Sequence, residues 1–206
     1  AQLGVPVPML QRGGSVVPMR ERVRCSAELQ RLDPFTLYIA PSHDELAAEG
    51  HLYMDDGQTF AYRDDQAFLA RKFTLTRDGP GHLRLASTSL TGRDIHTSAS
   101  STALQVPGNA YEQETSSVRV ERIIVYGLPE VHRIIARDAH GHETSLAFTY
   151  TSGTSRSPTA SDASARLASR LEIRDPRVLI GQDWSILMEI APYNASMTRP
   201  WARRHT

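Results

Sequence analysis

Residues 51–62, HLYMDDGQTFAY, form the stretch that decides the fold. Leu52 and Met54 alternate with more polar neighbours, and this period of two is typical of a β-strand with one buried face. Asp56 and Gly57 follow, and both residue types tolerate the positive φ that a tight turn requires. The stretch therefore predicts a strand that ends in a hairpin, with the chain reversing at the Asp-Gly pair.

Similar patterns recur on both sides of this stretch. Two strands joined or bent at Gly13-Gly14 are predicted within residues 5–19. Further strands are predicted over residues 35–40, 68–76, 82–87, 118–126, 131–137, 145–150, 171–173, 178–180 and 184–190. Residues 20–31 predict a loop with room for one helical turn, and no stretch keeps a helical period over more than about ten residues. Short strands separated by turns are typical of an all-β, antiparallel β-sandwich.

Two of these strands carry particular patterns. In residues 68–76, Leu69, Phe73 and Leu75 share one parity, which predicts one buried and one exposed face. Residues 118–126 contain three consecutive apolar residues, Ile123 to Val125, which predict a strand covered on both faces at the centre of the sandwich.

Serine and threonine dominate two segments. They make up 12 of the 31 residues at 87–117, where no hydrophobic period survives, and the composition repeats at 151–169. Both segments are interpreted as inserted surface loops, which at such a length are either functional or mobile.

Charge and composition argue against several classes of partner. Lys plus Arg and Asp plus Glu number 23 each, so no net field attracts nucleic acid or an anionic membrane. No apolar run approaches the roughly 20 residues that span a bilayer. The single cysteine, Cys25, cannot form an internal disulfide and is interpreted as an inert small residue. Residues 4–14 read as interior sequence, which predicts a piece of a longer chain.

The acidic pair in the opening stretch invites a catalytic interpretation. Asp55 and Asp56 are adjacent, so an ideal strand sends their side chains to opposite faces. A retaining glycosidase needs two facing carboxyl groups about 5 Å apart. A turn role is therefore favoured, and a calcium site would need more oxygen ligands than the nearby Asp64 and Asp65 supply.

Other chemistry-bearing residues favour structural interpretations. His140 and His142 form an HxH pair, but no cysteine or third histidine lies close in sequence, so a hairpin turn explains them without a metal. Trp184 alternates with apolar residues and is predicted in the core, whereas Trp201 lies in a polar tail and could stack on a sugar ring. Asn194 begins a glycosylation sequon. No cofactor and no metal site is predicted.

Six ordered segments resemble the C-terminal β-domains of family 31 glycoside hydrolases. They are VPMLQRGGSVVP, DPFTLYIA, GHLYMDDGQTFAY, FLARKFTL, VERIIVYG and DWSI, and the resemblance covers roughly residues 5–188. Within the family they are most similar to the α-glucosidases that trim glucose from N-linked glycans in the endoplasmic reticulum. The residues that carry the two family motifs are Arg12, Gly13, Gly14, Asp55, Asp56 and Gly57.

The resemblance implies a division of the chain. Residues 1–41 would complete a proximal β-sandwich that begins upstream, residues 42–190 would form the distal β-sandwich with insertions at 87–117 and 151–169, and residues 191–206 would be a tail. The family's catalytic aspartates would lie upstream of Ala1 in a (β/α)8 barrel. The resemblance thus implies that this chain holds no catalytic or substrate-binding residues of its own.

The same resemblance implies partners and a location. The chain would support the catalytic barrel of the same subunit, with Arg12 anchoring the sheet to it, and the parent enzyme would bind a regulatory β subunit and reach a glycan substrate in the endoplasmic-reticulum lumen. The alternative is a free-standing carbohydrate-binding β-sandwich that uses exposed aromatic side chains.

Overall fold

The computed structural model describes residues 10–90, 109–153 and 168–192. Its strands are β1 Ser15–Met19, β2 Phe35–Ala40, β3 Ala48–Met54, β4 Leu69–Arg77, β5 His82–Ser89, β6 Val120–Tyr126, β7 Val131–Arg137, β8 Glu143–Ser145, β9 Phe148–Thr151, β10 Arg170–Arg174 and β11 Trp184–Ile190. The helical elements are short: the 3₁₀ turn η1 Glu28–Gln30, α1 Ala61–Asp64 and α2 Ala110–Glu114. The prediction of an all-β chain is confirmed, and η1 is the helical turn expected in residues 20–31.

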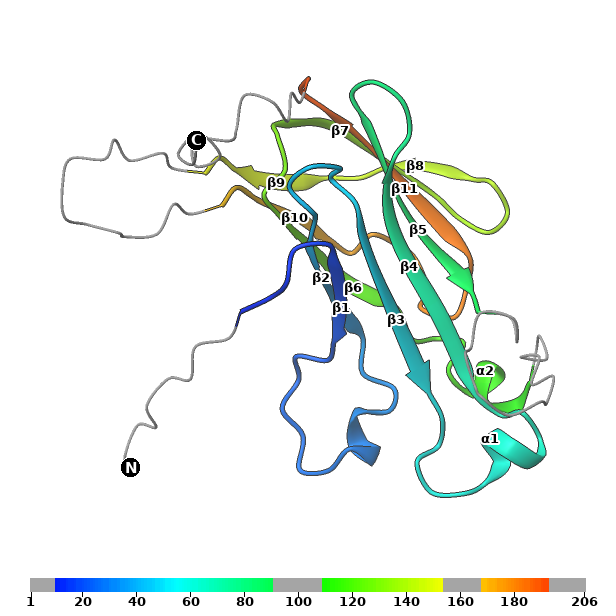
Figure 1. Cartoon of the computed structure of the whole chain (residues 1–206). Helices are drawn as coiled ribbons and strands as arrows, with labels where there is room; N and C mark the ends of the chain where they lie inside the picture. Colours follow the sequence, from blue (N-terminus) through cyan, green and yellow to red (C-terminus); the bar gives the residue numbers. More distant parts are fainter. Residues whose placement is uncertain (1–9, 91–108, 154–167, 193–206) are drawn as a thin grey trace, which may run out of the picture.

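All eleven strands belong to one hydrogen-bonded sheet. Its order is β8-β7-β11-β5-β4-β3-β1-β2-β6-β10-β9. The sheet curls, so that β3, β4 and β5 lie in front of β2, β6 and β10 (Figure 1). Most neighbouring strands are antiparallel, as predicted, but β1 runs parallel to β3 and β2 runs parallel to β6.

The strands before and after the predicted domain boundary share this sheet. β1 and β2 precede residue 42, yet β1 pairs with β3 and β2 pairs with β6 along Phe35 to Ile39. Both sides also contribute to one core. The division of the parent enzyme into a proximal and a distal domain stays a prediction.

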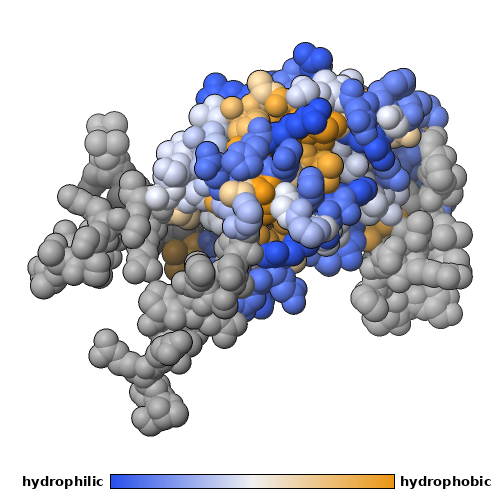
Figure 2. Space-filling view, turned by 90° about the horizontal axis from the view of Figure 1, so that it is seen from above, coloured by the Kyte–Doolittle hydropathy of each residue, from blue (hydrophilic) through white to orange (hydrophobic). Residues whose placement is uncertain are grey.

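One hydrophobic cluster fills the space inside the curl. It draws on both halves of the sheet, for example Leu75 and Leu85 from one and Ile123 and Leu171 from the other, all fully buried. Ile123, Ile124 and Val125 of β6 are all buried, which confirms the strand predicted to be covered on both faces. From above, apolar residues occupy the middle of the molecule's face and polar residues surround them (Figure 2).

The close approach of β1 to β3 requires a glycine. A Cβ built on Gly50 would lie 2.0 Å from the carbonyl oxygen of Val16 and 2.8 Å from its Cβ. No real Cβ atom fits at such distances, because the nearest contact is backbone. Gly50 lies inside β3, one residue before the stretch 51–62 for which the sequence predicts the strand.

The tight turn predicted at Asp56-Gly57 is wrong, because the connection between the two strands is longer. Gly57 does adopt a positive φ of 65°, and β3 does pair with an antiparallel successor. That successor is β4, however, and residues 55–68 between the two strands include α1. Residues 178–180, predicted as a strand, form only an isolated bridge between Leu179 and Arg119.

The first serine-rich segment contains regular structure at both of its ends. β5 extends to Ser89, and α2 begins at Ala110 after the N-cap Asn109. Residues 91–108 of that segment lie outside the described residues, as do residues 154–167 of the second one. So do residues 1–9 and residues 193–206, which include Asn194 and Trp201. Among the helices that are described, none is long and apolar enough to cross a membrane.

Candidate functional site: the cleft beside the Asp-Asp-Gly loop

The Asp-Asp-Gly motif lies in the loop that follows β3, and its own carboxylates hydrogen-bond within that loop. Asp55 Oδ1 accepts a hydrogen bond of 2.9 Å from the backbone N–H of Gly57. Asp56 Oδ1 accepts from the N–H groups of Gln58 (3.1 Å) and Thr59 (3.0 Å), and its Oδ2 accepts from the Thr59 hydroxyl. Such bonds between a side chain and nearby backbone stabilise turns, so the predicted turn role has a direct structural basis.

A cleft of about 360 Å³ opens next to this loop. Its walls come from the loop after β1, from the end of β3 and from α2, and they comprise Arg20, Ala27, Glu28, Arg31, Tyr53, Met54, Asp55, Asp56, Gly57, Gln58 and Tyr111. Charged groups of both signs and two phenol rings therefore line one concave surface, a composition suited to a polar ligand or a polar partner segment.

Arg20 forms the floor between the loop and the core. Its guanidinium lies 4.4 Å from the centre of the Phe35 ring and donates to the carbonyl of Arg31 at 2.9 Å. Burial lowers the pKa of Arg20, and the phenol of Tyr111 and the carboxylate of Asp33 partly offset this effect. Tyr111 itself is only 3% exposed, and burial raises its pKa.

The cleft lacks the features of a glycosidase's acid–base pair. Hydrogen bonds from Thr59, first from its hydroxyl and then from its backbone, lower the pKa of Asp56, whereas a general acid needs a raised one. Both oxygens of Asp56 accept hydrogen bonds from its own loop, and Asp55 bonds to the Gly57 N–H and to the Tyr53 side chain. Tyr53 is 52% exposed beside them, and its pKa is raised by burial of the phenol end and by Asp55.

The calcium site considered from the sequence is not assembled in the described residues. Asp64 is paired with Arg63 at 2.8 Å on the exposed face of α1. Neither Asp64 nor Asp65 joins Asp55 and Asp56 in a group of close ligand atoms within the described ranges.

The Arg-Gly-Gly motif lies at the start of β1. Gly14 has φ of 84°, a conformation that favours glycine, and its N–H donates to the carbonyl of Ala40 at 2.6 Å. Its own carbonyl accepts from the N–H of Glu49 at 3.1 Å, so this residue bridges the end of β2 and the start of β3. Gly13 and the Arg12 side chain are exposed, and the proposed anchoring role of Arg12 stays a prediction. The structure does not bring this motif into the cleft lining.

Trp184 lies in the core, as predicted, whereas the predicted inertness of Cys25 stays a prediction. Trp184 is 5% exposed, packs 6.1 Å from the Phe73 ring and donates from its indole N–H to the Leu179 carbonyl at 3.1 Å, so it is a core residue. Cys25 is exposed and unbridged.

The structure reveals a buried cation that the sequence reasoning passed over. Arg71 on β4 is 2% exposed and donates to Ser87, to two backbone carbonyls and to Asp183 at 2.6 Å. It shares the parity of Leu69 and Phe73, so strict alternation would have placed it inward.

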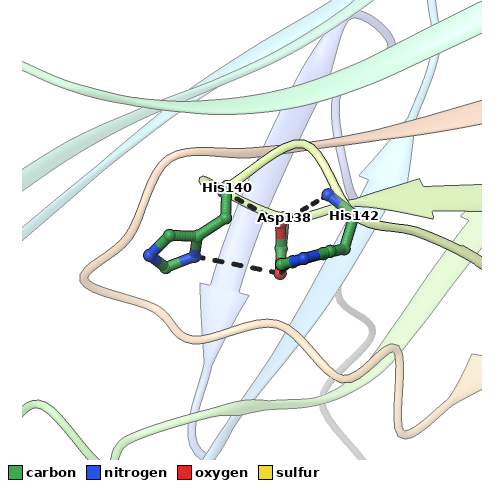
Figure 3. Close-up of side chains that lie close together, drawn as sticks. All are labelled: Asp138, His140 and His142. Atoms are coloured by element: carbon green, nitrogen blue, oxygen red, sulfur yellow. Dashed lines mark hydrogen bonds and ion pairs between the residues drawn. The ribbon is translucent and has the colours of Figure 1, made fainter.

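The histidine pair has a third neighbour. Asp138 lies two residues before His140 and four before His142, in the connection between β7 and β8, and the structure turns all three side chains toward one another (Figure 3). Their ligand atoms lie within 4.8 Å. Cysteine and histidine spacing alone does not predict this arrangement, because the third ligand is a carboxylate.

Comparison with known proteins shows what the chain is related to. No protein-family model matches it. It is 29% identical over 180 residues to human neutral alpha-glucosidase AB, covering 87% of this chain and 15% of that protein. It is 38% identical over 121 residues to the glucosidase 2 subunit alpha of Schizosaccharomyces pombe, covering 59% of this chain and 11% of that one.

Solved structures agree with the sequence comparison. The crystal structure of a DNJ-bound glucosidase II alpha subunit superposes with a TM-score of 0.64 and 26% identity, over 85% of this chain and 16% of that chain. The chain is homologous to glucosidase II α subunits. These enzymes are family 31 glycoside hydrolases, so the resemblance drawn from six ordered segments is confirmed.

The glucosidase II homology also bears on partners. The catalytic subunit of a heterodimeric endoplasmic-reticulum glucosidase II, solved with the binding domain of its regulatory subunit, matches with a TM-score of 0.63 and 27% identity. The present chain covers 16% of that subunit. It therefore corresponds to a small part of an α-glucosidase.

Proposed function

We propose that this chain is the C-terminal accessory β-part of an α-glucosidase of the glucosidase II type. It supports a catalytic barrel that another fragment of the same subunit carries. The main support for this proposal is the homology to α-glucosidases, which covers 87% of this chain but only 15% of the human relative. On this view the catalytic aspartates of a retaining mechanism lie in the remaining part, and the isolated chain hydrolyses nothing.

The distribution of exposed apolar side chains supports a docking role. Among the described residues, every exposed large hydrophobic side chain lies between positions 10 and 62; they are Leu10, Val17, Met19, Val23, Leu29, Leu32, Tyr53, Phe60 and Tyr62. A contiguous apolar patch marks an interaction site, and the proposal expects these side chains to contribute to one. Figure 1 shows the loop after β1 and the loop around α1 extending from the same end of the sheet.

The parent enzyme's substrate and location follow from the same proposal. The parent removes α-linked glucose from N-linked glycans in the endoplasmic-reticulum lumen and binds a regulatory β subunit there. A relative solved as a heterodimer with the binding domain of its regulatory subunit supports this partner.

Co-expression tests the proposal. A tagged 206-residue chain is produced with the polypeptide encoded upstream of Ala1, and turnover of a 4-nitrophenyl α-glucoside is followed. Activity is expected only when both parts are present, and both are expected to co-purify. Met19→Glu, at a side chain that is 41% exposed on β1, should weaken recovery of the upstream part. Thr76→Glu, at an exposed position on β4, is the matched control and should not.

Either of two results would sink the proposal: turnover by the pure chain, or a stable chain that never co-purifies with a catalytic part. The alternative, a free-standing carbohydrate-binding module, draws on the exposed Tyr53 ring beside the carboxylates of the cleft. Calorimetric titration with glucose-terminated oligosaccharides separates the two. The accessory role predicts no heat of binding, whereas the module predicts a heat that Tyr53→Ala abolishes.

A further inference from the structure

The five-residue connection 138–142 between β7 and β8 gathers three potential metal ligands. Asp138 Oδ2 lies 3.1 Å from His142 Nδ1 and 4.0 Å from His140 Nδ1. In Figure 3 both imidazole rings approach the same carboxylate, from opposite sides. The two histidine side chains are 71% and 80% exposed, so the outer side of the cluster is open to solvent.

These distances suit a small divalent ion. Zn²⁺ binds histidine nitrogen and carboxylate oxygen at about 2.0–2.2 Å, which places the ligand atoms of a tetrahedral site about 3.4 Å apart. The observed 3.1 and 4.0 Å lie on either side of that value, so small rotations of exposed side chains complete the geometry. Two imidazoles and one carboxylate leave a fourth position for water.

The backbone orients the carboxylate in advance. Asp138 Oδ1 accepts from the N–H groups of His140 and His142, both at 2.9 Å, which directs Oδ2 toward the rings. The loop is closed by a bond of 3.1 Å from the Asp138 N–H to the His142 carbonyl, and Gly141 takes φ of 84°. Outer hydrogen bonds that fix a ligand in this way raise the affinity of metal sites.

The flanking charges do not compete for the ligands. Arg137 and Glu143, at the ends of the loop, pair with each other at 2.5 Å, and their Cα atoms are partners in the β7–β8 ladder. The two strands therefore hold the ends of the loop at a fixed separation.

We propose that Asp138, His140 and His142 form a surface site for a divalent late transition-metal ion, with Zn²⁺ as the bound ion. The imidazole-rich set favours Zn²⁺, Ni²⁺ and Cu²⁺ over Ca²⁺ and Mg²⁺, which prefer all-oxygen sites. The site is independent of the glucosidase proposal, because it depends only on residues 137–143.

Titration of the full chain with ZnCl₂ tests the site. Isothermal calorimetry supplies affinity and stoichiometry, and ¹H–¹⁵N correlation spectra supply location, which matters because the chain has eight histidines. The expected result is one Zn²⁺ per chain, with shifts centred on residues 138–142. The same concentration of Ca²⁺ should leave these signals in place.

Matched variants decide the outcome. Asp138→Asn keeps the Oδ1 acceptor that closes the turn but removes the anionic ligand, and His142→Gln removes an imidazole; each should weaken Zn²⁺ binding at least about tenfold. His51→Gln is the control: His51 lies 3.6 Å from Glu49, and no third ligand joins this pair among the described residues, so the variant should bind like the wild type. Three results would overturn the site: no Zn²⁺ binding by the wild type, binding unaffected by Asp138→Asn and His142→Gln, or an equal loss in His51→Gln.

Discussion

Replacement of Arg71 by methionine should destabilise the chain far more than replacement of a surface arginine. Arg71 is 2% exposed and donates to Ser87 Oγ at 3.0 Å, to the carbonyls of Gly181 (3.3 Å) and Gln182 (2.6 Å), and to Asp183 Oδ1 (2.6 Å). It thus ties β4 and β5 to the segment that leads into β11. Burial lowers its pKa, and the hydrogen bond and charge of Asp183 counteract that effect.

The expected cost follows from what methionine leaves behind. Asp183 is 63% exposed and can be rehydrated, so no unpaired charge remains in the core. The hydroxyl of Ser87 and the two carbonyls lose their donor, and each buried polar group left without a partner costs about 1–3 kcal/mol. Water can reach the part-buried carbonyls of Gly181 and Gln182 and relieves part of this penalty. Arg71→Met should therefore lower the free energy of unfolding by about 2–4 kcal/mol.

Asp183→Asn should cost less. The charge of Arg71 stays buried, but its hydrogen bonds to Ser87 and the two carbonyls remain, and a partner this exposed contributes about 1–2 kcal/mol.

The matched control is the pair of Arg84 with Asp78. It has the same N–O distance of 2.6 Å, but its side chains are 46% and 40% exposed. Arg84→Met should therefore change stability by no more than about 1 kcal/mol. Urea unfolding followed by tryptophan fluorescence measures all three variants, with equal m-values as the check on two-state behaviour. The reasoning is refuted if Arg71→Met costs no more than Arg84→Met.

Two further substitutions probe other parts of the sheet. Gly50→Ala would place a Cβ 2.0 Å from the Val16 carbonyl oxygen and should lower the free energy of unfolding by about 2–4 kcal/mol, measured by thermal or urea unfolding. Gly13→Ala is the control: its Cβ would have its nearest contact at 3.5 Å, and it should cost less than about 1 kcal/mol. Equal effects of the two substitutions would contradict the packing argument. Glu172 is 6% exposed, and although its burial raises the pKa, hydrogen bonding from Arg174 and the charges of three neighbouring arginines lower it overall. A lowered folded-state pKa gives stability that is present above the unfolded value of about 4.3 and is lost as pH falls through the folded value. The stability difference between wild type and Glu172→Gln should be constant above about pH 5 and shrink toward pH 3, and a difference that grows on acidification would refute this sign.

The sequence predicted individual strands better than their connections. β2 and β7 have the predicted boundaries, because their apolar patterns are local properties of the chain. The parallel pairing of β2 with β6 joins segments about 85 residues apart, and no local pattern reports it. Likewise, Asp56 was recognised as a turn former, but the three hydrogen bonds it accepts from residues 58 and 59 direct the chain toward α1 instead of an immediate reversal.

The candidate sites show the same division. Trp184 could be placed in the core from its alternation, whereas the inward parity of Arg71 was overlooked because a charged residue contradicts the usual composition of a buried face. The proposed metal ligands could be predicted from the sequence only in part. His140 and His142 were noticed as a pair, but Asp138 becomes a ligand only through the hydrogen bonds that fold its carboxylate back over the loop.

The position of β1 explains the roles of two glycines beside it, Gly14 and Gly50. In the strand order, β1 alone joins the half that ends in β3 to the half that begins with β2. Its ladder with β2 spans five pairs, but its ladder with β3 has the single pair Ser15 and Glu49. That junction therefore depends on the bridging hydrogen bonds of Gly14 and on the missing Cβ of Gly50. If the catalytic part docks beside the exposed side chains of β1, as proposed, it contacts the strand whose ladder with β3 has only one residue pair. Docking of the barrel should then stabilise the junction most, and amide exchange in β1 and β3 should slow more than exchange in β7 and β11 when the two parts assemble.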